Sequence, residues 1–278
     1  MLSINPKEIE VPKLHHYLLG AVGPRPIAFA STIDENGVAN LSPFSFFNVF
    51  SANPPIMVFS PARSGRTGAT KNTLDNVKKI KEVVINVVSH DIVQQMSLSS
   101  SPYDASIDEF VKAGLTPIAS DEIKPFRVKE SPVQFECKVN EIIELGQNGG
   151  AGNLVICEVV KIHINEDILD DKGMIDQHKI DLVSPMGGNW YCRADKNSMF
   201  EIQKPITTIG IGVDQIPENI RNSAILTGND LGLLGSVEAL PTSEDIANFE
   251  APNGEKEVVA KALIEQGKVL DAWKVLMG

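Results

Sequence analysis

Cysteine is scarce in this chain, which has three in 278 residues and no Cys-x-x-Cys pair. Cys137 and Cys157 lie within apolar, strand-like runs, whereas Cys192 stands apart from both. Because a free cysteine usually behaves as a small buried hydrophobe, we expect structural roles for the first two. Neither a disulfide framework nor a zinc site is therefore expected.

Positive charge and long apolar runs are also in short supply. The chain carries 25 Lys and Arg residues against 36 Asp and Glu residues, a net charge of −11. Nucleic acids and anionic membranes attract basic surfaces, so neither is expected as a partner. No run approaches the ~20 apolar residues that cross a bilayer. The N-terminal residues lack the charged-then-apolar layout of a signal peptide, so a cytoplasmic location is the default expectation.

Recognisable catalytic motifs are missing as well. The chain has no Gly-x-Ser-x-Gly elbow, no metal-ligand spacing of His, Cys and Asp, and no carboxylate pair that stands out from the acidic background. No Gly-x-Gly-x-x-Gly follows a strand, and strands do not alternate strictly with helices, which disfavours a Rossmann domain. We therefore predict no catalytic side chain and no metal ligand. This pattern suits an enzyme whose chemistry belongs to a bound cofactor.

Strand-like segments dominate up to about residue 165. Runs of β-branched and apolar residues occur at 55–60, 82–88, 133–143 and 154–164, and the last two flank a glycine-rich turn at 147–153. In the third run, Gln134, Glu136, Lys138 and Asn140 are predicted to point outward. Short helices are predicted over 73–80, 92–98 and 107–113. Six or so strands with short helices indicate a mainly β fold, a small closed or nearly closed barrel.

The sequence pattern changes from strand-like to irregular and helical beyond about residue 200. Prolines punctuate the segment, and apolar residues recur at helical spacing from 258 to 276. We expect residues 1–200 to form the main domain. Residues 201–278 should form a partly helical extension that ends in an amphipathic helix broken near Gly267.

The stretch from Arg25 to Asn48 is the most informative part of the chain. Residues 27–32 alternate as in a half-buried strand, and residues 34–37 supply the Asn and Gly of a tight turn. Short polar groups at Asn40, Ser42 and Ser45 then alternate with phenylalanines. That mixture suits a planar heterocycle, which needs apolar cover and a few edge hydrogen bonds. An ordinary hairpin with a phenylalanine-rich core flank remains the alternative.

The segment from Ser60 to Thr73 carries the densest anion-binding potential. Arg63, Arg66 and Lys71 bring positive charge to an acidic protein, among several hydroxyl and amide groups. Lys71-Asn72-Thr73 also opens a predicted helix, whose free N–H groups and dipole favour a phosphate. A solvated basic loop is the alternative. Taken together, the two segments describe a site for a mononucleotide with a flat ring.

These motifs resemble a known family. Arg25-Pro-Ile-Ala-Phe-Ala-Ser-Thr, Asn40-Leu-Ser-Pro-Phe-Ser-Phe-Phe-Asn48, Pro54-Pro55, Lys71-Asn-Thr73 and Gly187-Gly188-x-Trp-Tyr191 look like the flavin reductase-like, FMN-binding split-barrel family, in order over residues 10–195. The resemblance implies a Greek-key split barrel, a homodimer with FMN near the subunit interface, and reduction of flavin by NADH or NADPH. An acceptor oxygenase or redox protein would then be a partner.

The family pattern also implies the cofactor site. Residues 40–45 would border the isoalloxazine and ribityl chain, and residues 60–73 would receive the phosphate. The cofactor-binding residues expected are Asn40, Ser42, Pro43, Phe44, Ser45, Ser60, Arg66, Lys71, Asn72 and Thr73.

The chain departs from the family at one informative place. Many relatives carry a Gly-Asp-His before the last barrel strand, with the histidine near the nicotinamide, whereas this chain has Gly146-Gln-Asn-Gly-Gly-Ala-Gly-Asn153. The leading interpretation is an FMN-dependent oxidoreductase that passes hydride from NAD(P)H to flavin. The alternatives are an FMN-binding electron carrier without a nicotinamide site and a barrel that binds no flavin.

Overall fold

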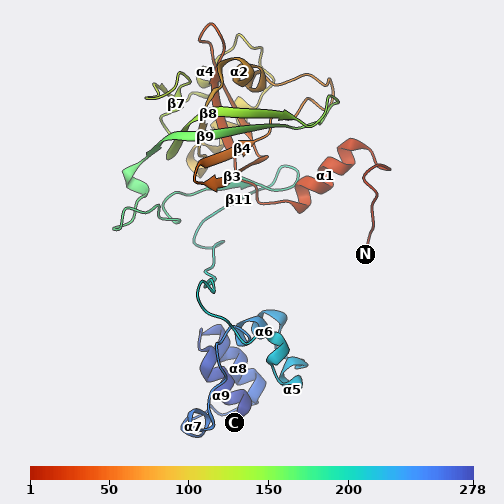
Figure 1. The fold of residues 1–278 in the computed structure, drawn as a ribbon, viewed down its shortest axis with the longest axis vertical. Coiled ribbons are helices and arrows are strands. Elements are labelled where there is room, and N and C mark those ends of the chain that lie inside the picture. The colour runs from red at the N-terminus through yellow and green to blue at the C-terminus, as the bar shows by residue number, and fades with distance from the viewer. The chain divides into compact units, whose positions relative to one another are not determined.

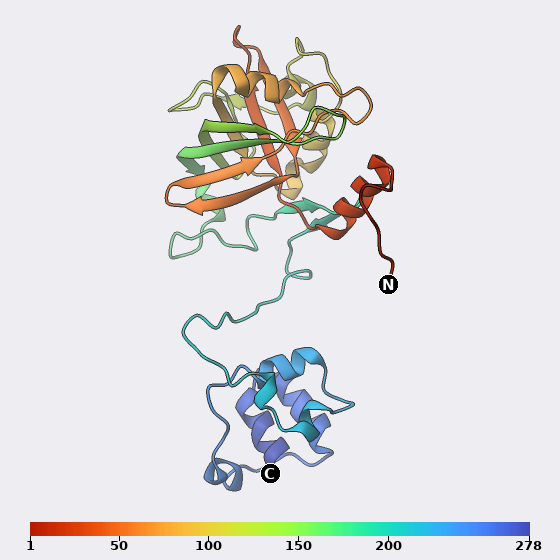
Figure 2. The same ribbon diagram turned by 45° about the vertical axis from the view of Figure 1, so that its right-hand side comes forward.

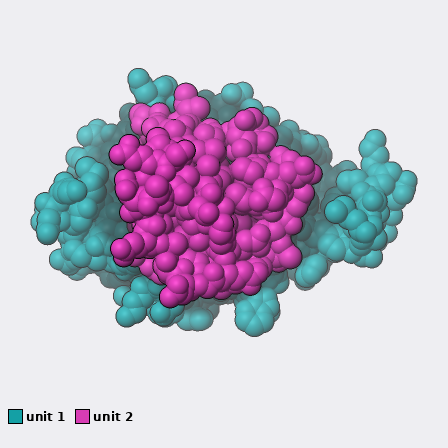
Figure 3. All heavy atoms as spheres, turned by 90° about the horizontal axis from the view of Figure 1, so that it is seen from below, with its two compact units in different colours: residues 1–200 teal, residues 201–278 magenta.

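The computed structural model describes residues 1–278, which form two compact units, residues 1–200 and residues 201–278 (Figure 3). The first unit is built on a seven-stranded antiparallel sheet with the strand order β2-β1-β5-β8-β9-β4-β3 (Figure 1). Its strands are β1 (Ala28–Ile33), β2 (Ala39–Phe44), β3 (Phe47–Ala52), β4 (Pro55–Phe59), β5 (Glu82–Asn86), β8 (Val133–Glu144) and β9 (Asn153–Ile164).

The sheet is a barrel with one open seam. Its two edge strands, β2 and β3, are consecutive in the chain and are separated only by Ser45 and Phe46, yet they do not pair with each other. The sheet must therefore curl until its two ends meet at this corner, as Figure 2 shows. The antiparallel pairing and the predominance of strands confirm the predicted mainly β fold, and a doubly wound sheet is ruled out.

Short elements surround this sheet. Two small antiparallel pairs are β6 (Pro117–Ile118) with β7 (Arg127–Val128), and β10 (Val183–Pro185) with β11 (Tyr191–Arg193). The helices of the first unit are α1 (Val11–Ala21), α2 (Asn72–Ile80), α3 (Val93–Ser99) and α4 (Glu109–Ala113). The predicted helices over 73–80, 92–98 and 107–113 correspond to α2, α3 and α4. Neither α1 nor β3 was expected.

Strand β1 is buried on both faces, so the predicted half-buried strand is wrong. Ala28 and Ala30 face the barrel interior, where they join a core with Phe59, Leu74 and other apolar residues. Phe29 faces the opposite side and packs in a second core with residues of α3 and α4. The alternation of small and large residues in β1 therefore reflects two apolar cores, one on each face of the strand, rather than one buried face and one solvent-exposed face.

The prediction that Gln134 and Glu136 point to solvent is also wrong. Both side chains are buried. The backbone N–H groups of Asp121 and Glu122 donate to the Glu136 carboxylate over 2.8 and 2.7 Å, so the segment before β7 covers this face of β8. Polar residues on an alternating strand indicate a face only when nothing else in the chain folds over it. The cysteines behave as expected, with Cys137 and Cys157 both buried.

The second unit is helical and has its own apolar core. It contains α5 (Glu218–Arg221), α6 (Gly228–Leu234), α7 (Ser243–Ala247), α8 (Lys256–Glu265) and α9 (Val269–Met277). Trp273 is wholly buried and donates its indole N–H to the carbonyl of Leu234 over 2.9 Å. The break between α8 and α9 falls at Gly267, whose φ is +74°. No helix of the chain is both long and apolar enough to span a membrane.

Candidate functional site

The N-terminus of α2 presents an open set of hydrogen-bond donors. Neither Asn72 nor Thr73 donates its backbone N–H to a protein acceptor, and Lys71 at the N-cap makes no side-chain cap. The side chains of Arg66 and Lys71 are exposed and form no hydrogen bond or ion pair. Asp75 accepts a hydrogen bond from Thr70 in the same turn. Free cations beside free N–H groups at a helix N-terminus are the elements of an anion site.

The third cation of this loop has a different role. Arg63 donates to Glu144 Oε2 over 3.1 Å and to Gln147 Oε1 over 3.0 Å, and Lys78 on α2 also pairs with Glu144. Hydrogen bonds from Lys78, Gln147 and Arg63 lower the pKa of Glu144 to about 2. Arg63 is therefore neutralised, and it ties the loop to the end of β8.

The glycine-rich turn packs directly on the same loop. A side chain at Gly149 would come within 2.9 Å of the carbonyl oxygens of Ser64 and Gly65, and one at Gly152 within 2.8 Å of Ser60 Oγ. Arg63 donates its backbone N–H to the carbonyl of Ala151 over 2.9 Å. Gly149 and Gly152 are thus required by close approach of the loop, Gly150 by its φ of +84°, and the turn supports the loop at 60–69.

Asn153 forms hydrogen bonds to Ser60 and to the residue that follows it. The backbone N–H of Asn153 donates to Ser60 Oγ over 3.0 Å, and its side-chain amide donates to the carbonyl of Pro61 over 2.7 Å. The Asn153 Oδ1 atom is buried and has no partner. A buried acceptor without a donor is uncommon in proteins. The two hydrogen bonds of Asn153 thus join the start of β9 to the start of the loop at Ser60 and Pro61.

A buried polar network connects the two predicted segments. Asn40 donates its side-chain amide to Thr73 Oγ1 over 2.9 Å and to Thr32 Oγ1 over 3.2 Å. Asn76 on α2 also donates to Thr32. Because both Asn40 and Thr73 are buried, their side chains join β2 to the start of α2.

The remaining residues of the first segment lie at the seam of the barrel. Ser42, Pro43, Phe44 and Ser45 are all partly buried at the end of β2 and the corner that follows it. The Phe44 ring packs on Phe59 with centroids 5.7 Å apart. Ser60 donates its backbone N–H to the carbonyl of Phe46, so this corner adjoins the start of the cationic loop. The structure thus brings the two predicted segments side by side.

Arg25 lies behind this corner and was not among the expected site residues. Its guanidinium donates to Ser45 Oγ over 3.3 Å, to the carbonyls of Leu19 and Val22 over 2.7 and 2.6 Å, and to the carbonyl of Met186 over 2.7 Å. The residue is 6% exposed and forms no ion pair. Burial lowers the pKa of its guanidinium. One side chain thus joins the predicted flavin corner to the end of α1 and to the Gly187-Gly188 turn.

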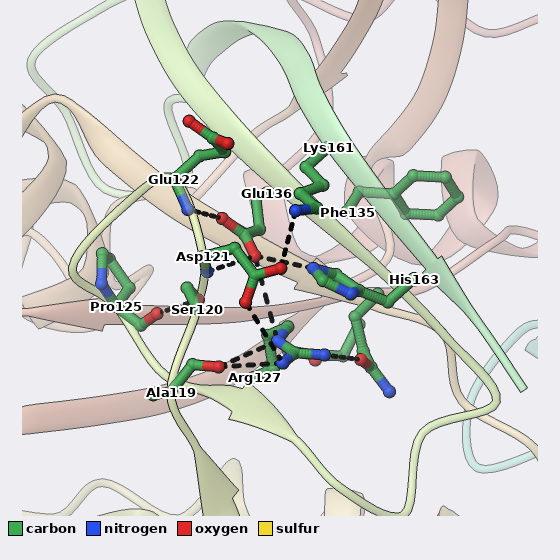
Figure 4. Close-up of polar contacts among 12 residues, drawn as sticks. Ala119, Ser120, Asp121, Glu122, Pro125, Arg127, Phe135, Glu136, Lys161 and His163 are labelled. Carbon is green, nitrogen blue, oxygen red and sulfur yellow. Dashed lines mark hydrogen bonds and ion pairs between the residues drawn. The ribbon is translucent and has the colours of Figure 1, made fainter.

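A second group of charged residues lies on the outer face of β8 and β9 (Figure 4). His163 Nε2 lies 2.7 Å from Glu136 Oε1, and Lys161 pairs with Asp121 over 2.6 Å. Burial alone would raise the pKa of Glu136, but hydrogen bonds from the Asp121 and Glu122 backbone and from His163 lower it below its ordinary value. Asp121, Glu136 and His163 are close enough to hold a metal ion, but Lys161 and Arg127 already neutralise these carboxylates.

A cavity of about 550 Å³ lies away from the predicted site. It is lined by His90 before α3, by residues of α3, and by the β10–β11 pair with its turn, including Gln94, Tyr191 and Arg193. None of the ten expected cofactor residues lines it. Arg193 there is paired with Asp181 over 2.6 Å. Since its only cation is neutralised, this cavity is a poorer anion site than the start of α2.

Comparison with known proteins decides the family. The model of the flavin reductase-like domain matches residues 21–181. The chain belongs to this family. Among solved structures, nitrilotriacetate monooxygenase component B from Bacillus cereus is 31% identical to this chain, with a TM-score of 0.67 over 73% of this chain and 98% of that one.

Two further solved structures agree. The 2-nitrobenzoate 2-nitroreductase NbaA of Pseudomonas fluorescens is 25% identical, with a TM-score of 0.67 over 76% of this chain and all of that one. A Shewanella frigidimarina protein described as a flavin reductase with a split-barrel domain is 27% identical, with a TM-score of 0.61 over 73% of this chain and 100% of that one. The split-barrel fold and a flavin-related redox function follow from membership of the flavin reductase-like family.

The residues present fit a flavin mononucleotide. The open N-terminus of α2 with Arg66 and Lys71 suits a phosphate, and the half-buried corner at Ser42–Ser45 offers hydroxyl groups beside apolar surface. Arg66, Lys71, Asn72 and Thr73 would hold the phosphate, and the corner would border the ring. A bound flavin would supply the hydride-accepting chemistry that the side chains of this chain lack.

Proposed function

We propose that this protein is an FMN-dependent oxidoreductase that takes hydride from NADH or NADPH. The observation that carries the proposal is the unpaired charge of Arg66 and Lys71 at the uncapped start of α2, in a chain with a net charge of −11. Unpaired cations are exposed here although most basic groups nearby are neutralised by carboxylates. A phosphate is the natural partner for such a site.

The chain's own residues would bind and orient the flavin rather than exchange protons with it. Ser42 and Ser45 supply neutral hydroxyl groups, and Asn40 and Thr73 fix the distance between the corner and the phosphate end through their buried hydrogen bond. None of these groups has a pKa suited to general acid–base catalysis. The contribution of the protein to the rate is then mainly one of position.

A homodimer is part of the proposal. No residue of α1 is buried, and Val49 and Phe50 on the edge strand β3 are 56% and 68% exposed. Both elements lie beside the proposed site, since His15 of α1 stacks edge-on against Phe46 at 6.3 Å. An exposed apolar edge strand is usually covered in the native assembly. A second copy of the chain is the proposed cover, and it would complete the wall of the flavin site.

One observation favours an electron carrier as the second candidate. The glycine-rich turn at 146–153 replaces the family's Gly-Asp-His and is packed on the phosphate loop. It therefore places no histidine near a nicotinamide. The names of the relatives suggest partners for either function, because one of them is the component B of a monooxygenase. An acceptor oxygenase or redox protein is accordingly proposed as the electron acceptor.

The test begins with the purified full-length chain. We expect it to acquire the visible absorbance of bound flavin on incubation with FMN, and to bleach under anaerobic conditions on addition of NADH or NADPH. Binding of FMN without bleaching by either nucleotide would replace the oxidoreductase with the electron carrier. Absence of FMN binding would refute both.

A further inference from the structure

Arg25 is a buried cation without an anionic partner. Its side chain is 6% exposed, and no carboxylate oxygen lies within ion-pair distance of it. Buried charges in proteins are normally paired, because removing an ion from water is costly. The other buried or half-buried arginines of the first unit follow this rule, with Arg63 beside Glu144 and Arg127 beside Glu136.

The hydrogen bonds of Arg25 satisfy most of its donors without neutralising it. A guanidinium has five N–H groups. Four are used by neutral oxygens, namely Ser45 Oγ and the carbonyls of Leu19, Val22 and Met186. The two carbonyls at the end of α1 bring the partial negative charge of a helix C-terminus, which offsets only part of a full charge. A net positive potential therefore remains around the guanidinium.

This charge lies at the corner where the flavin ring is expected. Arg25 Nε donates to Ser45 Oγ, and Ser45 belongs to the two-residue junction between β2 and β3. The cations expected at the phosphate end of the site, Arg66 and Lys71, belong to a different segment, the loop and helix start that follow Ser60. Because Arg25 is bonded to Ser45, its charge lies beside the residues expected to border the ring rather than beside those expected to hold the phosphate.

We propose that Arg25 supplies the positive charge that stabilises the reduced, anionic form of the flavin. This inference rests on the proposed binding of FMN. Oxidised flavin is neutral at its ring. Hydride transfer to a bound flavin would oxidise NAD(P)H to NAD(P)+, bring two electrons and one proton to the flavin, and leave its ring with one negative charge. A fixed cation close to this charge favours the product over the oxidised form.

The proposal is tested by comparing the affinities for oxidised and reduced FMN. We expect the wild-type protein to bind reduced FMN about ten-fold more tightly than oxidised FMN, which raises the midpoint potential by ~30 mV for a two-electron couple. Arg25→Lys retains the charge and should keep this ratio within about three-fold, although it loses the planar fork. Arg25→Gln should abolish most of the preference.

The control variant is Arg193→Gln. It removes the same charge from an exposed residue that is already paired with Asp181, so the affinity ratio should be that of the wild type. A purely structural role for Arg25 would lower the melting temperature of Arg25→Gln without changing the ratio. An unchanged ratio in a folded Arg25→Gln protein with bound FMN would therefore overturn the proposal.

Two further outcomes keep the test decisive. If Arg25→Gln does not fold, the wild-type measurement decides alone, and a midpoint potential of bound FMN at or below that of free FMN overturns the proposal. If the wild-type protein binds no FMN, the proposed function itself fails, and that result is recognised before any potential is measured.

Discussion

Arg63 and Glu144 lie 3.1 Å apart and join the loop after β4 to the end of β8. The pair explains why three cations in one loop are not equivalent. Arg63 is bound to the protein, whereas Arg66 and Lys71 remain open to solvent. We therefore expect Arg63 to stabilise the fold, and Arg66 and Lys71 to bind a ligand.

Arg66 and Lys71 should bind the phosphate of FMN. The double variant Arg66→Ala, Lys71→Ala should weaken FMN binding by about 1.5–3 kcal/mol for each contact and leave riboflavin binding nearly unchanged. Titration of flavin fluorescence with both ligands measures the difference. Lys112→Ala, Lys129→Ala is the matched control, because it removes two exposed cations that form no ion pair and lie outside this loop and α2. Equal losses for FMN and riboflavin would mean that the loop is only a solvated basic patch.

The stabilising effect of Arg63 should depend on the charge of Glu144. Because the folded-state pKa of Glu144 is about 2, below the ordinary 4.5, the carboxylate contributes stability above pH 4.5 that disappears as the pH falls toward 2. Glu144→Gln should therefore melt at a lower temperature than the wild type near neutral pH, and the two melting curves should converge in acid. Glu141→Gln, an exposed residue on the same strand, serves as the control. A gap that persists at the lowest pH would exclude the ion pairs as its cause.

Asn40 and Ser42 should separate structural from cofactor effects. Asn40→Ala removes two buried hydrogen bonds, so it should lower the free energy of unfolding by about 0.5–1.5 kcal/mol for each bond and also loosen FMN. The Ser42 side chain makes no such hydrogen bond, so Ser42→Ala should weaken FMN binding with little change in the free energy of unfolding. Saturating FMN should restore much of the NAD(P)H oxidation rate in both variants. Complete loss of turnover with FMN fully bound would contradict a mechanism in which the cofactor carries the chemistry.

The dimer should depend on the edge strand β3. Phe50→Lys places a charge on the exposed apolar edge and should convert a two-fold dimer into a monomer with weaker FMN binding. Light scattering measures the mass, and Val111→Lys, at an exposed apolar position on α4, is the control. A wild-type monomer that binds FMN stoichiometrically would remove the second subunit from the site.

The sequence was most reliable where a pattern was local. Period-2 alternation and the glycine-rich turn predicted β8 and β9, and Gly267 predicted the break between the last two helices. The short strand β3 was missed because Phe46, Phe47 and Phe50 have the composition of a pocket wall as well as that of a strand. Helix α1 was missed because it has no buried face, and without one the usual helical periodicity does not arise.

The two segments that form the candidate site were predicted from the sequence, but the distant residues that hold these segments in place were not. Both predicted segments lie side by side, and their hydroxyls and cations could be chosen by residue type. Asn153, Glu144 and Arg25 act on these segments from 20 to 93 positions away. Nothing in their local sequence distinguishes Glu144 from other acidic residues. For Arg25 a weak signal existed, since a charged residue stands three positions before a strand that carries no charge.

The order of the strands also has a consequence for synthesis of the chain on the ribosome. Strand β4 pairs with β9, so that Met57 lies opposite Cys157, and the seam at Ser45–Phe46 cannot form until β9 has been translated. Strands β3 and β4 can pair with each other early, but the other edge of β4 stays unpaired until residues made much later are available. Pairings this distant in sequence form slowly. During translation this nascent segment is the part of the chain most exposed to aggregation, and the part for which a chaperone would matter most.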